Sequence, residues 1–337
     1  MKKLIVLACL LGSLILVAFS VGRRDQFPIP GGWPKPYYNF KKHPLSKEKI
    51  ALGRLLFYDP ILSADNTISC AGCHAQSSSF THVDHNLSHG IGGKIGTRNS
   101  PVLINLAWSS SFMWDGAVGK LDEQAKKPIT NPLEMGETIA HVTAKLQASA
   151  KYPTLFYEAY GDSIITDEMI TKSLTQFVLT LVSANARYDK VMRGEEQFTD
   201  HEAKGYALFQ QHCATCHTEP LFTNSAFENN GLEPDTALHD VGLMKITRRS
   251  ADSLKFKVPT LRNIEYSAPY MHDGRFKTLN MVLNNYIRGL DHGPTLSPKL
   301  QKGIYFTNDE KYDVIAFLLT LSDKQFIKDP QFSYTAK

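Results

Sequence analysis

Apolar residues recur at helical spacing along most of the chain. The segment 307–323 is the clearest case, with large apolar residues on one helical face at Val314, Phe317, Leu318 and Leu321. Capping residues mark helix starts at Thr166, at Thr199 with Glu202, and at Thr307 with Glu310. Loops rich in Gly, Pro, Asn and Ser, such as residues 86–101, separate these segments, and no sheet is obvious. The predicted fold class is all-α.

The N-terminus follows a different pattern. Lys2 and Lys3 precede an apolar run from Leu4 to Phe19, and the small residues Ala18 and Ser20 flank its end. A charged start, an apolar middle and a small-residue site are typical of a secretory signal peptide. We predict a signal peptide over residues 1–22 and a periplasmic protein. The alternative is an uncleaved N-terminal anchor, although the run is short for a membrane span.

Composition adds limits rather than a function. A chain of 337 residues with 42% apolar and 21% charged residues is typical of a globular protein with one or two domains. The formal charge of +4 is small for this length and gives no indication of nucleic-acid binding.

Four of the five cysteines lie in two C-x-x-C-H motifs. The six residues are Cys70, Cys73, His74, Cys213, Cys216 and His217. This motif attaches c-type haem, with the cysteines as thioether links and the histidine as an iron ligand. Short disulfides or a redox C-x-x-C are the alternative, but a histidine directly after the second cysteine in both copies favours haem. We predict two covalently bound c-type haems.

The chain contains an internal duplication. Residues 53–60 (GRLLFYDP) and 205–212 (GYALFQQH) both read G-x-x-L-F before a haem motif. Residues 100–121 likewise match residues 258–279, from P-x-L-x-N to M-x-D-G at identical spacing. A repeat of this length predicts two related haem domains. We place a leader or anchor at 1–22, an N-terminal haem domain at 23–186 and a C-terminal haem domain at 187–337.

The repeat distinguishes the two haems. Tyr286 lies seven residues after Leu279, whereas the matching position in the first domain is Pro128. Tyrosine can bind haem iron and proline cannot. We therefore predict that Tyr286 closes the second iron opposite His217 and that the first iron, on His74, is open. Competing ligands for the second iron are Met271, Met281 and His272, and a packed core tyrosine is the alternative for Tyr286.

Two polar residues follow Trp114 in the first domain, Gln124 and Glu134. A carboxylate above an open haem can move a proton between the oxygens of peroxide. Glu134 is therefore a candidate acid–base group, although by itself it resembles an ordinary loop acid. Charge and position also assign Arg98 and Arg262 to the haem propionates.

Taken together, the chain resembles the bacterial di-haem cytochrome c peroxidases, a family that includes MauG. The resemblance covers about residues 45–322 and is carried by the motifs ISCAGCH, GGKIGTRNSP, FMWDG, NPLEMG, CATCH, FKVPTLRN and APYMHDGRFKTL. It implies that the first haem is peroxidatic and that the second transfers electrons.

The resemblance also implies roles for individual residues. Trp114 matches the tryptophan that lies between the two haems, and Gln124, Pro128 and Glu134 match the distal residues of the first haem. A calcium ion between the domains would be held by the positions that match Asn99, Ser267 and Pro269, which suit a hard cation. The implied partners are hydrogen peroxide and a small electron donor, either a c-type cytochrome or a cupredoxin. Members of the family are often dimers, which leaves a homodimer open here.

Two positions depart from the common pattern. Tyr286 stands where most of these peroxidases have methionine, as in the MauG-like members. Ile91 stands where many members have a histidine that blocks the first haem. The nearby histidines are His82, His85 and His89; we expect solvated loop side chains, and a substitute iron ligand is the alternative.

Three functions remain in competition. We favour a peroxidase that reduces hydrogen peroxide at the first haem with electrons relayed through Trp114 and the second haem. A MauG-like enzyme that oxidises residues of a partner protein is the second hypothesis. The third is a di-haem electron carrier without a substrate.

Overall fold

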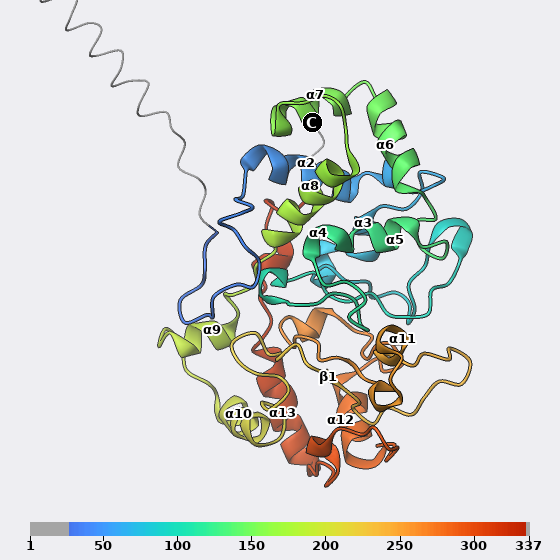
Figure 1. Cartoon of the computed structure of the whole chain (residues 1–337). Helices are drawn as coiled ribbons and strands as arrows, with labels where there is room; N and C mark the ends of the chain where they lie inside the picture. The colour runs from blue at the N-terminus through green and yellow to red at the C-terminus, as the bar shows by residue number, and fades with distance from the viewer. Residues whose placement is uncertain (1–26, 335–337) are drawn as a thin grey trace, which may run out of the picture.

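The computed structural model describes residues 27–334, so the predicted leader at 1–22 lies outside the described residues. Two helical lobes lie one above the other, and each contains one long crossed helix pair (Figure 1). The upper lobe is built on α2 (Lys47–Tyr58) and α8 (Asp167–Leu179), and the lower lobe on α10 (Asp200–His212) and α13 (Asn308–Leu319). Helices dominate and the described residues form only a two-stranded sheet, which confirms the all-α prediction.

Shorter elements complete the lobes. The other α-helices are α3 (Cys70–Cys73), α4 (Leu121–Gln124), α5 (Lys126–Thr130), α6 (Ile139–Ala148), α7 (Tyr152–Tyr160), α9 (Arg187–Met192), α11 (Met244–Thr247) and α12 (Leu279–Arg288). The 3-10 helices are η1 (Pro60–Leu62), η2 (Gln76–Ser78), η3 (Ile91–Gly93), η4 (Leu106–Trp108), η5 (Ser250–Asp252), η6 (Ile264–Tyr266), η7 (Pro298–Leu300) and η8 (Phe326–Lys328). Strands β1 (Phe227–Glu228) and β2 (Phe256–Lys257) pair antiparallel. No helix within residues 27–334 is both long enough and apolar enough to cross a membrane.

The helix starts follow the sequence signals. Thr199 and Glu202 form a capping box on α10, and Thr307 and Glu310 form one on α13. The Thr166 hydroxyl accepts a hydrogen bond from the Met169 amide at the start of α8. These contacts satisfy amides that have no partner within the helix, and they confirm the predicted starts.

The duplication is visible in the helix crossings. A side chain at Gly53 of α2 would place its Cβ 1.8 Å from the Ser173 carbonyl oxygen of α8. At the equivalent Gly205 of α10, the Cβ would lie 1.9 Å from the Asp313 oxygen of α13. Glycine is required at both positions because the helix backbones touch there.

Replacing Gly205 with alanine should therefore destabilise the lower lobe by about 3 kcal/mol, the upper end of the cost of overpacking. The methyl group can be accommodated only if α10 moves away from α13. Urea unfolding followed by far-UV circular dichroism measures the loss. Gly119→Ala is the matched control, because its new methyl would meet no atom within 4 Å. Equal urea midpoints for the two variants would contradict the close helix approach.

The loops between the helices repeat as well. Asn105 and Asn263 both adopt left-handed backbone angles, with φ 57° and 59°. Their amides donate to the Leu181 and Leu321 carbonyls at 2.9 and 3.0 Å. Asparagine tolerates this conformation better than most residues do. The P-x-L-x-N repeat is thus a repeated turn that ties each loop to the end of its long helix.

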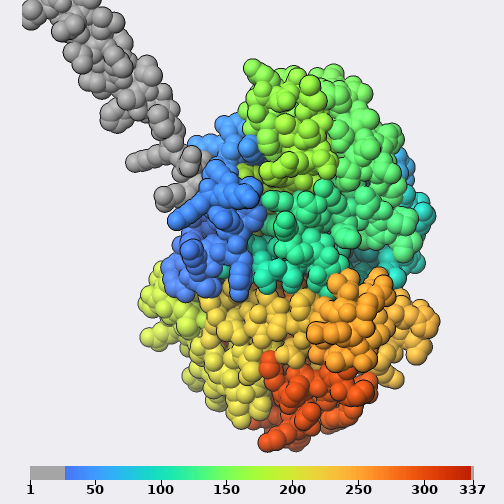
Figure 2. Space-filling view, viewed as in Figure 1, coloured from blue at the N-terminus to red at the C-terminus, as the bar shows by residue number. Residues whose placement is uncertain are grey.

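Segments distant in sequence join the lobes. The N-terminal segment, blue in Figure 2, lies along one side of the upper lobe and reaches the boundary with the lower lobe. Its Trp33 packs edge-on against Trp108, with ring centroids 4.8 Å apart. The C-terminal segment returns to the upper lobe, where Phe326 is buried in the core that runs from Leu52 to Leu181. The core of the lower lobe runs from Tyr188 to Leu321. The domain boundary at residue 186 stays a sequence-based prediction.

Candidate active site

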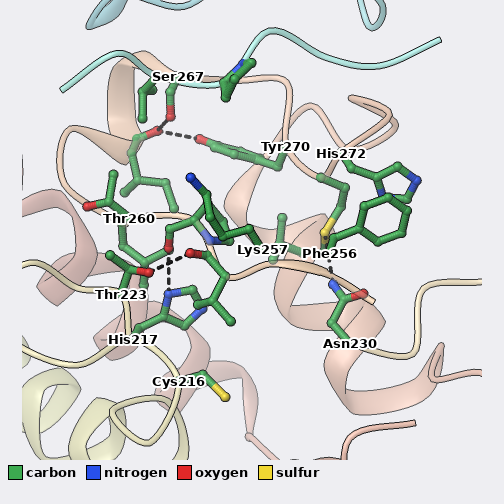
Figure 3. A pocket seen from close by; sticks show the side chains of 18 of the residues that line it. Cys216, His217, Thr223, Asn230, Phe256, Lys257, Thr260, Ser267, Tyr270 and His272 are labelled. Carbon is green, nitrogen blue, oxygen red and sulfur yellow. Dashed lines mark hydrogen bonds between the residues drawn. The ribbon is translucent and has the colours of Figure 1, made fainter. Parts of the chain in front are cut away.

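The second C-x-x-C-H motif lies at the end of α10 and lines the main cavity. Nδ1 of His217 lies 3.2 Å from the Phe222 carbonyl oxygen and 3.1 Å from the Pro259 carbonyl oxygen (Figure 3). A carbonyl can only accept, so Nδ1 carries the proton and Nε2 keeps its lone pair for a metal. Burial lowers the pKa of His217 to about 4, which keeps the ring neutral. Cys213 and Cys216 are not joined in a disulfide, so both sulfurs are available for thioether links. This donor set fits a c-type haem.

The first motif repeats this arrangement. Cys70 and Cys73 lie on α3, whose start is capped by the Ser69 hydroxyl. Nδ1 of His74 donates to the Phe80 carbonyl oxygen at 2.9 Å, and burial lowers the pKa of His74 to about 4. The hydrogen-bonded nitrogen fixes the ring orientation and leaves Nε2 available. Both motifs therefore present a neutral imidazole beside two thiols.

The cavity has a volume of about 290 Å³ and a mainly apolar lining. It extends from Cys216 and His217 to Tyr286, and it reaches the upper lobe at Trp114 and Gln124. Cys70, Cys73 and His74 are not among its lining residues. An apolar hollow with a few polar groups is typical of a cofactor site.

Tyr286 is on α12 and faces this cavity. Burial raises the pKa of its hydroxyl to about 12, although the hydrogen bond from Asn230 opposes this. Met281, on the same helix, is 41% exposed and does not line the cavity. Tyr286 is therefore placed on the same cavity as the second motif, and Met281 is not.

The two remaining competitors line the cavity but are engaged elsewhere. The Met271 sulfur lies 3.4 Å from the amide nitrogen of Asn230. The His272 ring stacks on Phe256 with centroids 3.7 Å apart. The same Asn230 nitrogen lies 3.5 Å from the Tyr286 hydroxyl, so the contact with Asn230 does not separate Met271 from Tyr286. The stack on Phe256 would have to break before the His272 ring could move toward a metal. The structure thus favours Tyr286 over His272, and the choice of Tyr286 over Met271 stays a prediction from the sequence.

In the upper lobe, the equivalent residue Pro128 lies on α5 and offers no metal ligand. Glu134 lies in the loop after α5, half-buried, and accepts a hydrogen bond from the Asn131 amide at 2.7 Å. Burial raises the pKa of the Glu134 carboxyl, although the Asn131 contact opposes this. The Glu134 charge in turn contributes to the raised pKa of Cys73, after burial. The Cys73 sulfur lies 3.5 Å from the His89 carbonyl oxygen, and the glycine that follows His89 packs on the Glu134 backbone. Glu134 therefore lies near the first motif, and its catalytic role stays a prediction.

The loop that carries Ile91 packs against the Glu134 loop. The Ile91 amide donates to the Glu134 carbonyl oxygen at 2.8 Å, and a Cβ on Gly90 would lie 2.4 Å from that oxygen. Close backbone contact therefore holds Ile91 in place. The three loop histidines form a stack, with centroid distances of 5.1 Å for His82–His85 and 4.0 Å for His85–His89. The sequence predicted solvated side chains, and only His85 among them is exposed.

Trp114 joins the two lobes. Its indole nitrogen donates to the Asn99 carbonyl oxygen at 2.9 Å, and its own carbonyl accepts from the Lys257 amide at 2.8 Å. It also lines the cavity. Trp114 thus lies at the boundary of the two lobes, and its place between two haems stays a prediction from the family resemblance.

The three residues assigned to calcium lie near one another. The Asn99 amide is 3.3 Å from the Pro269 carbonyl oxygen and 3.1 Å from the Asn86 carbonyl oxygen. Ser267 is at the end of η6, two positions before Pro269, and its hydroxyl donates to the Ile264 carbonyl oxygen at 3.4 Å. The structure brings Asn99 and Pro269 into contact across the lobe boundary.

Both arginines assigned to propionates are paired with carboxylates. Arg98 contacts Asp115 at 2.8 Å and Asp240 at 2.6 Å. Arg262 is fully buried and forms two hydrogen bonds to Asp189. These carboxylates already neutralise the guanidinium charges, so the structure gives both arginines another role, namely inter-segment ion pairs.

Two polar residues that line the cavity, Lys257 and Asn230, were not predicted from the sequence. Lys257 donates to the Ser111 carbonyl oxygen at 2.9 Å, and burial lowers its pKa to about 8. Asn230 follows β1 in a loop that contains no motif (Figure 3). Lys257 lies within FKVPTLRN, so the motif was a usable signal; Asn230 had none.

Comparisons with known proteins agree with this geometry. The model of the di-haem cytochrome c peroxidase family matches residues 47–197, and the cytochrome c model matches residues 202–322. The chain is 38% identical to the methylamine utilization protein MauG of Methylorubrum extorquens, over 88% of this chain and 84% of the relative. It is 34% identical to the cytochrome c551 peroxidase of Nitrosomonas europaea, over 84% of this chain and 82% of the relative.

One solved structure is similar over nearly its whole length. It is a MauG-like protein associated with microbial copper homeostasis, with a TM-score of 0.81 and 32% identity. The match covers 91% of this chain and 98% of that protein. Two c-type haems follow from the matched models and the two motifs.

Proposed function

This chain belongs to the di-haem cytochrome c peroxidase family, which includes MauG, and we propose that it reduces hydrogen peroxide to water at the first haem. In this proposal the second haem relays electrons from a small c-type cytochrome or a cupredoxin. His74 would hold the first iron, and His217 with Tyr286 the second.

The difference between the two lobes carries the proposal. Tyr286 lines the cavity of the second motif, and its repeat counterpart in the upper lobe is Pro128. A half-buried carboxylate, Glu134, lies near Cys73 of the first motif. A site without a second protein ligand and with an acid–base group suits a small substrate better than electron transfer alone.

Bound haem supplies one-electron chemistry and, on its open side, a coordination position for peroxide. Glu134 would accept one proton from the peroxide and return it to the departing oxygen, which leaves as water. Two electrons from the donor protein and two further protons would convert the other oxygen to a second water. Gln124, at the end of α4, would orient the peroxide by hydrogen bonding, as the family resemblance implies. Trp114, anchored by the Asn99 carbonyl, holds an aromatic ring between the lobes for electron passage.

A MauG-like oxidation of a partner protein is the second candidate. Two observations favour it. The relative MauG is 38% identical to this chain. Tyr286 lines the cavity of the second motif, at a sequence position where methionine is common in peroxidases of the family. Tyrosinate stabilises ferric iron, which makes uptake of electrons from a high-potential donor less favourable.

Steady-state assays with hydrogen peroxide and a reduced c-type cytochrome test the proposal. We expect rapid peroxide-dependent oxidation of the cytochrome. Slow turnover, together with peroxide-dependent oxidation of an added partner protein, would support the MauG-like function instead. Electron paramagnetic resonance of the resting ferric protein supplies a check, since two low-spin signals without a high-spin signal would contradict an open first haem and leave an electron carrier.

Further parts of the proposal rest on the sequence. We propose export to the periplasm, with residues 1–22 as signal peptide or anchor, because bacterial c-type haem is attached outside the cytoplasm. We also propose a calcium ion at Asn99, Ser267 and Pro269 on the family resemblance. Asn99 and Pro269 lie close across the lobe boundary, and the Asn99 amide, whose nitrogen donates to the Pro269 carbonyl oxygen, would turn its oxygen toward the ion. We further propose that a homodimer can form, because members of the family are often dimers.

A further inference from the structure

Asn230 presents its amide to the Tyr286 hydroxyl. It lies just after β1, in a loop that lines the cavity of the second C-x-x-C-H motif (Figure 3). Its nitrogen Nδ2 is 3.5 Å from the Tyr286 oxygen and 3.4 Å from the Met271 sulfur. We propose that Asn230 is a positioning residue that hydrogen-bonds the iron-binding oxygen of Tyr286 and thereby sets the electron affinity of the second haem. This inference rests on the proposed ligation by Tyr286.

The orientation of the amide follows from its surroundings. The Asn230 oxygen Oδ1 accepts a hydrogen bond from the Leu232 amide at 3.4 Å. Because a backbone N–H must meet an acceptor, the carbonyl end of the side chain faces the loop and the NH₂ end faces the cavity. Two N–H groups are then available for two acceptors, the Tyr286 oxygen and the Met271 sulfur.

The loop around Asn230 is itself anchored. The neighbouring Asn229 is buried, accepts from the Gly231 amide at 2.9 Å and donates to the Thr295 hydroxyl at 2.9 Å. The Asn230 side chain therefore starts from a fixed backbone. A donor held in place before the ligand binds is more effective than one that must be ordered afterwards.

Charge explains why a long contact in the neutral phenol matters. Tyr286 must lose its proton to bind ferric iron as tyrosinate, and the oxygen then becomes an anionic acceptor. Hydrogen bonds to anions are shorter and stronger than those to neutral groups. A donor on the tyrosinate oxygen also withdraws electron density from the iron, which favours the reduced state.

The upper lobe contains a related contact. The Gln124 amide nitrogen lies 3.8 Å from the Met113 sulfur, and Met113 is the repeat counterpart of Met271. Both methionines have left-handed backbone angles, φ 68° and 77°. Gln124 comes from α4 and Asn230 from the β1 loop, so two unrelated segments place an amide on equivalent methionines. Only the amide of the lower lobe also reaches a tyrosine hydroxyl.

Potentiometric titration of the di-haem protein tests the role of Asn230. Asn230→Leu and Asn230→Ala both remove the N–H donors, and alanine fits even if leucine is too large. We expect the midpoint potential of the second haem to shift downward in both variants, with a changed low-spin resonance signal and an unchanged first haem. Asn284→Leu is the matched control, since Asn284 is an exposed amide on α12 that does not line the cavity.

The variants separate the ligation of iron by Tyr286 from the role of Asn230. If Tyr286→Phe leaves the second haem's resonance signal unchanged, the ligation by Tyr286 is wrong. If Tyr286→Phe alters the signal but both Asn230 variants keep the parent's potential and signal, Tyr286 is the ligand and the role of Asn230 is overturned.

Discussion

Replacing Glu134 with glutamine is expected to lower kcat for peroxide reduction by about 10²–10⁴-fold, the range for loss of a general acid–base group. Glutamine keeps the size of the side chain and the acceptor for Asn131, but it cannot carry a proton between the peroxide oxygens. The fall should appear in kcat more than in KM because peroxide still binds. Stopped-flow and steady-state assays with a reduced c-type cytochrome measure it.

The pH dependence gives an independent check. Glu134 must be a carboxylate to accept the first proton, so kcat/KM should fall as the pH drops through the pKa of this group. Burial raises that pKa, so the acid limb should lie above the ordinary range of glutamate, about pH 4.3. The limb should be absent from Glu134→Gln.

The control for this variant is Glu123→Gln on α4, where the carboxylate is exposed and contacts Lys126. It should retain the parent's rate and its acid limb. Near-normal turnover in Glu134→Gln, or an acid limb that survives the substitution, would mean that another group moves the proton.

Replacing Arg262 with methionine is expected to lower the free energy of unfolding by about 3–5 kcal/mol, the cost of leaving a buried charge without its partner. Arg262 is fully buried, donates to both oxygens of Asp189 at 2.9 and 2.7 Å, and donates to the Ser183 carbonyl oxygen at 3.3 Å. Its guanidinium also covers the Trp33 ring at 4.7 Å. Methionine fills similar space but leaves the Asp189 carboxylate uncompensated.

A double variant separates charge from packing. Asp189→Leu combined with Arg262→Met removes both charges, so it should be more stable than Arg262→Met alone. Arg193→Met removes an exposed arginine that pairs with Glu195 and should change little. Chemical denaturation followed by circular dichroism compares the three. A double variant as unstable as Arg262→Met would show that lost packing, rather than the stranded carboxylate, causes the effect.

Much of the molecule was determined by local sequence. The helix starts at Thr199 and Thr307 depend on residues three positions apart, so they can be predicted from the sequence. The haem motifs are equally local, and the duplicated M-x-D-G and P-x-L-x-N segments predict two related lobes from the sequence alone. The repeat also singled out Tyr286 against Pro128, and the structure places Tyr286 on the second cavity.

Tertiary structure decided what depends on side chains from distant segments. Met271, Met281 and His272 were equal competitors in sequence, because nothing local tells which face of a helix or turn meets a cavity. Exposure sets Met281 aside, and stacking on Phe256 engages His272. Asn230, from another segment, contacts both Met271 and Tyr286.

The same reason explains the arginines and the chain ends. Charge and position in the sequence assign Arg262 to a propionate, whereas the fold brings Asp189, 73 positions away, against it. The return of Phe326 to the upper lobe is likewise invisible to any local pattern. Contacts between residues close in sequence can be read from spacing, whereas partners that meet only after the chain has folded require the structure.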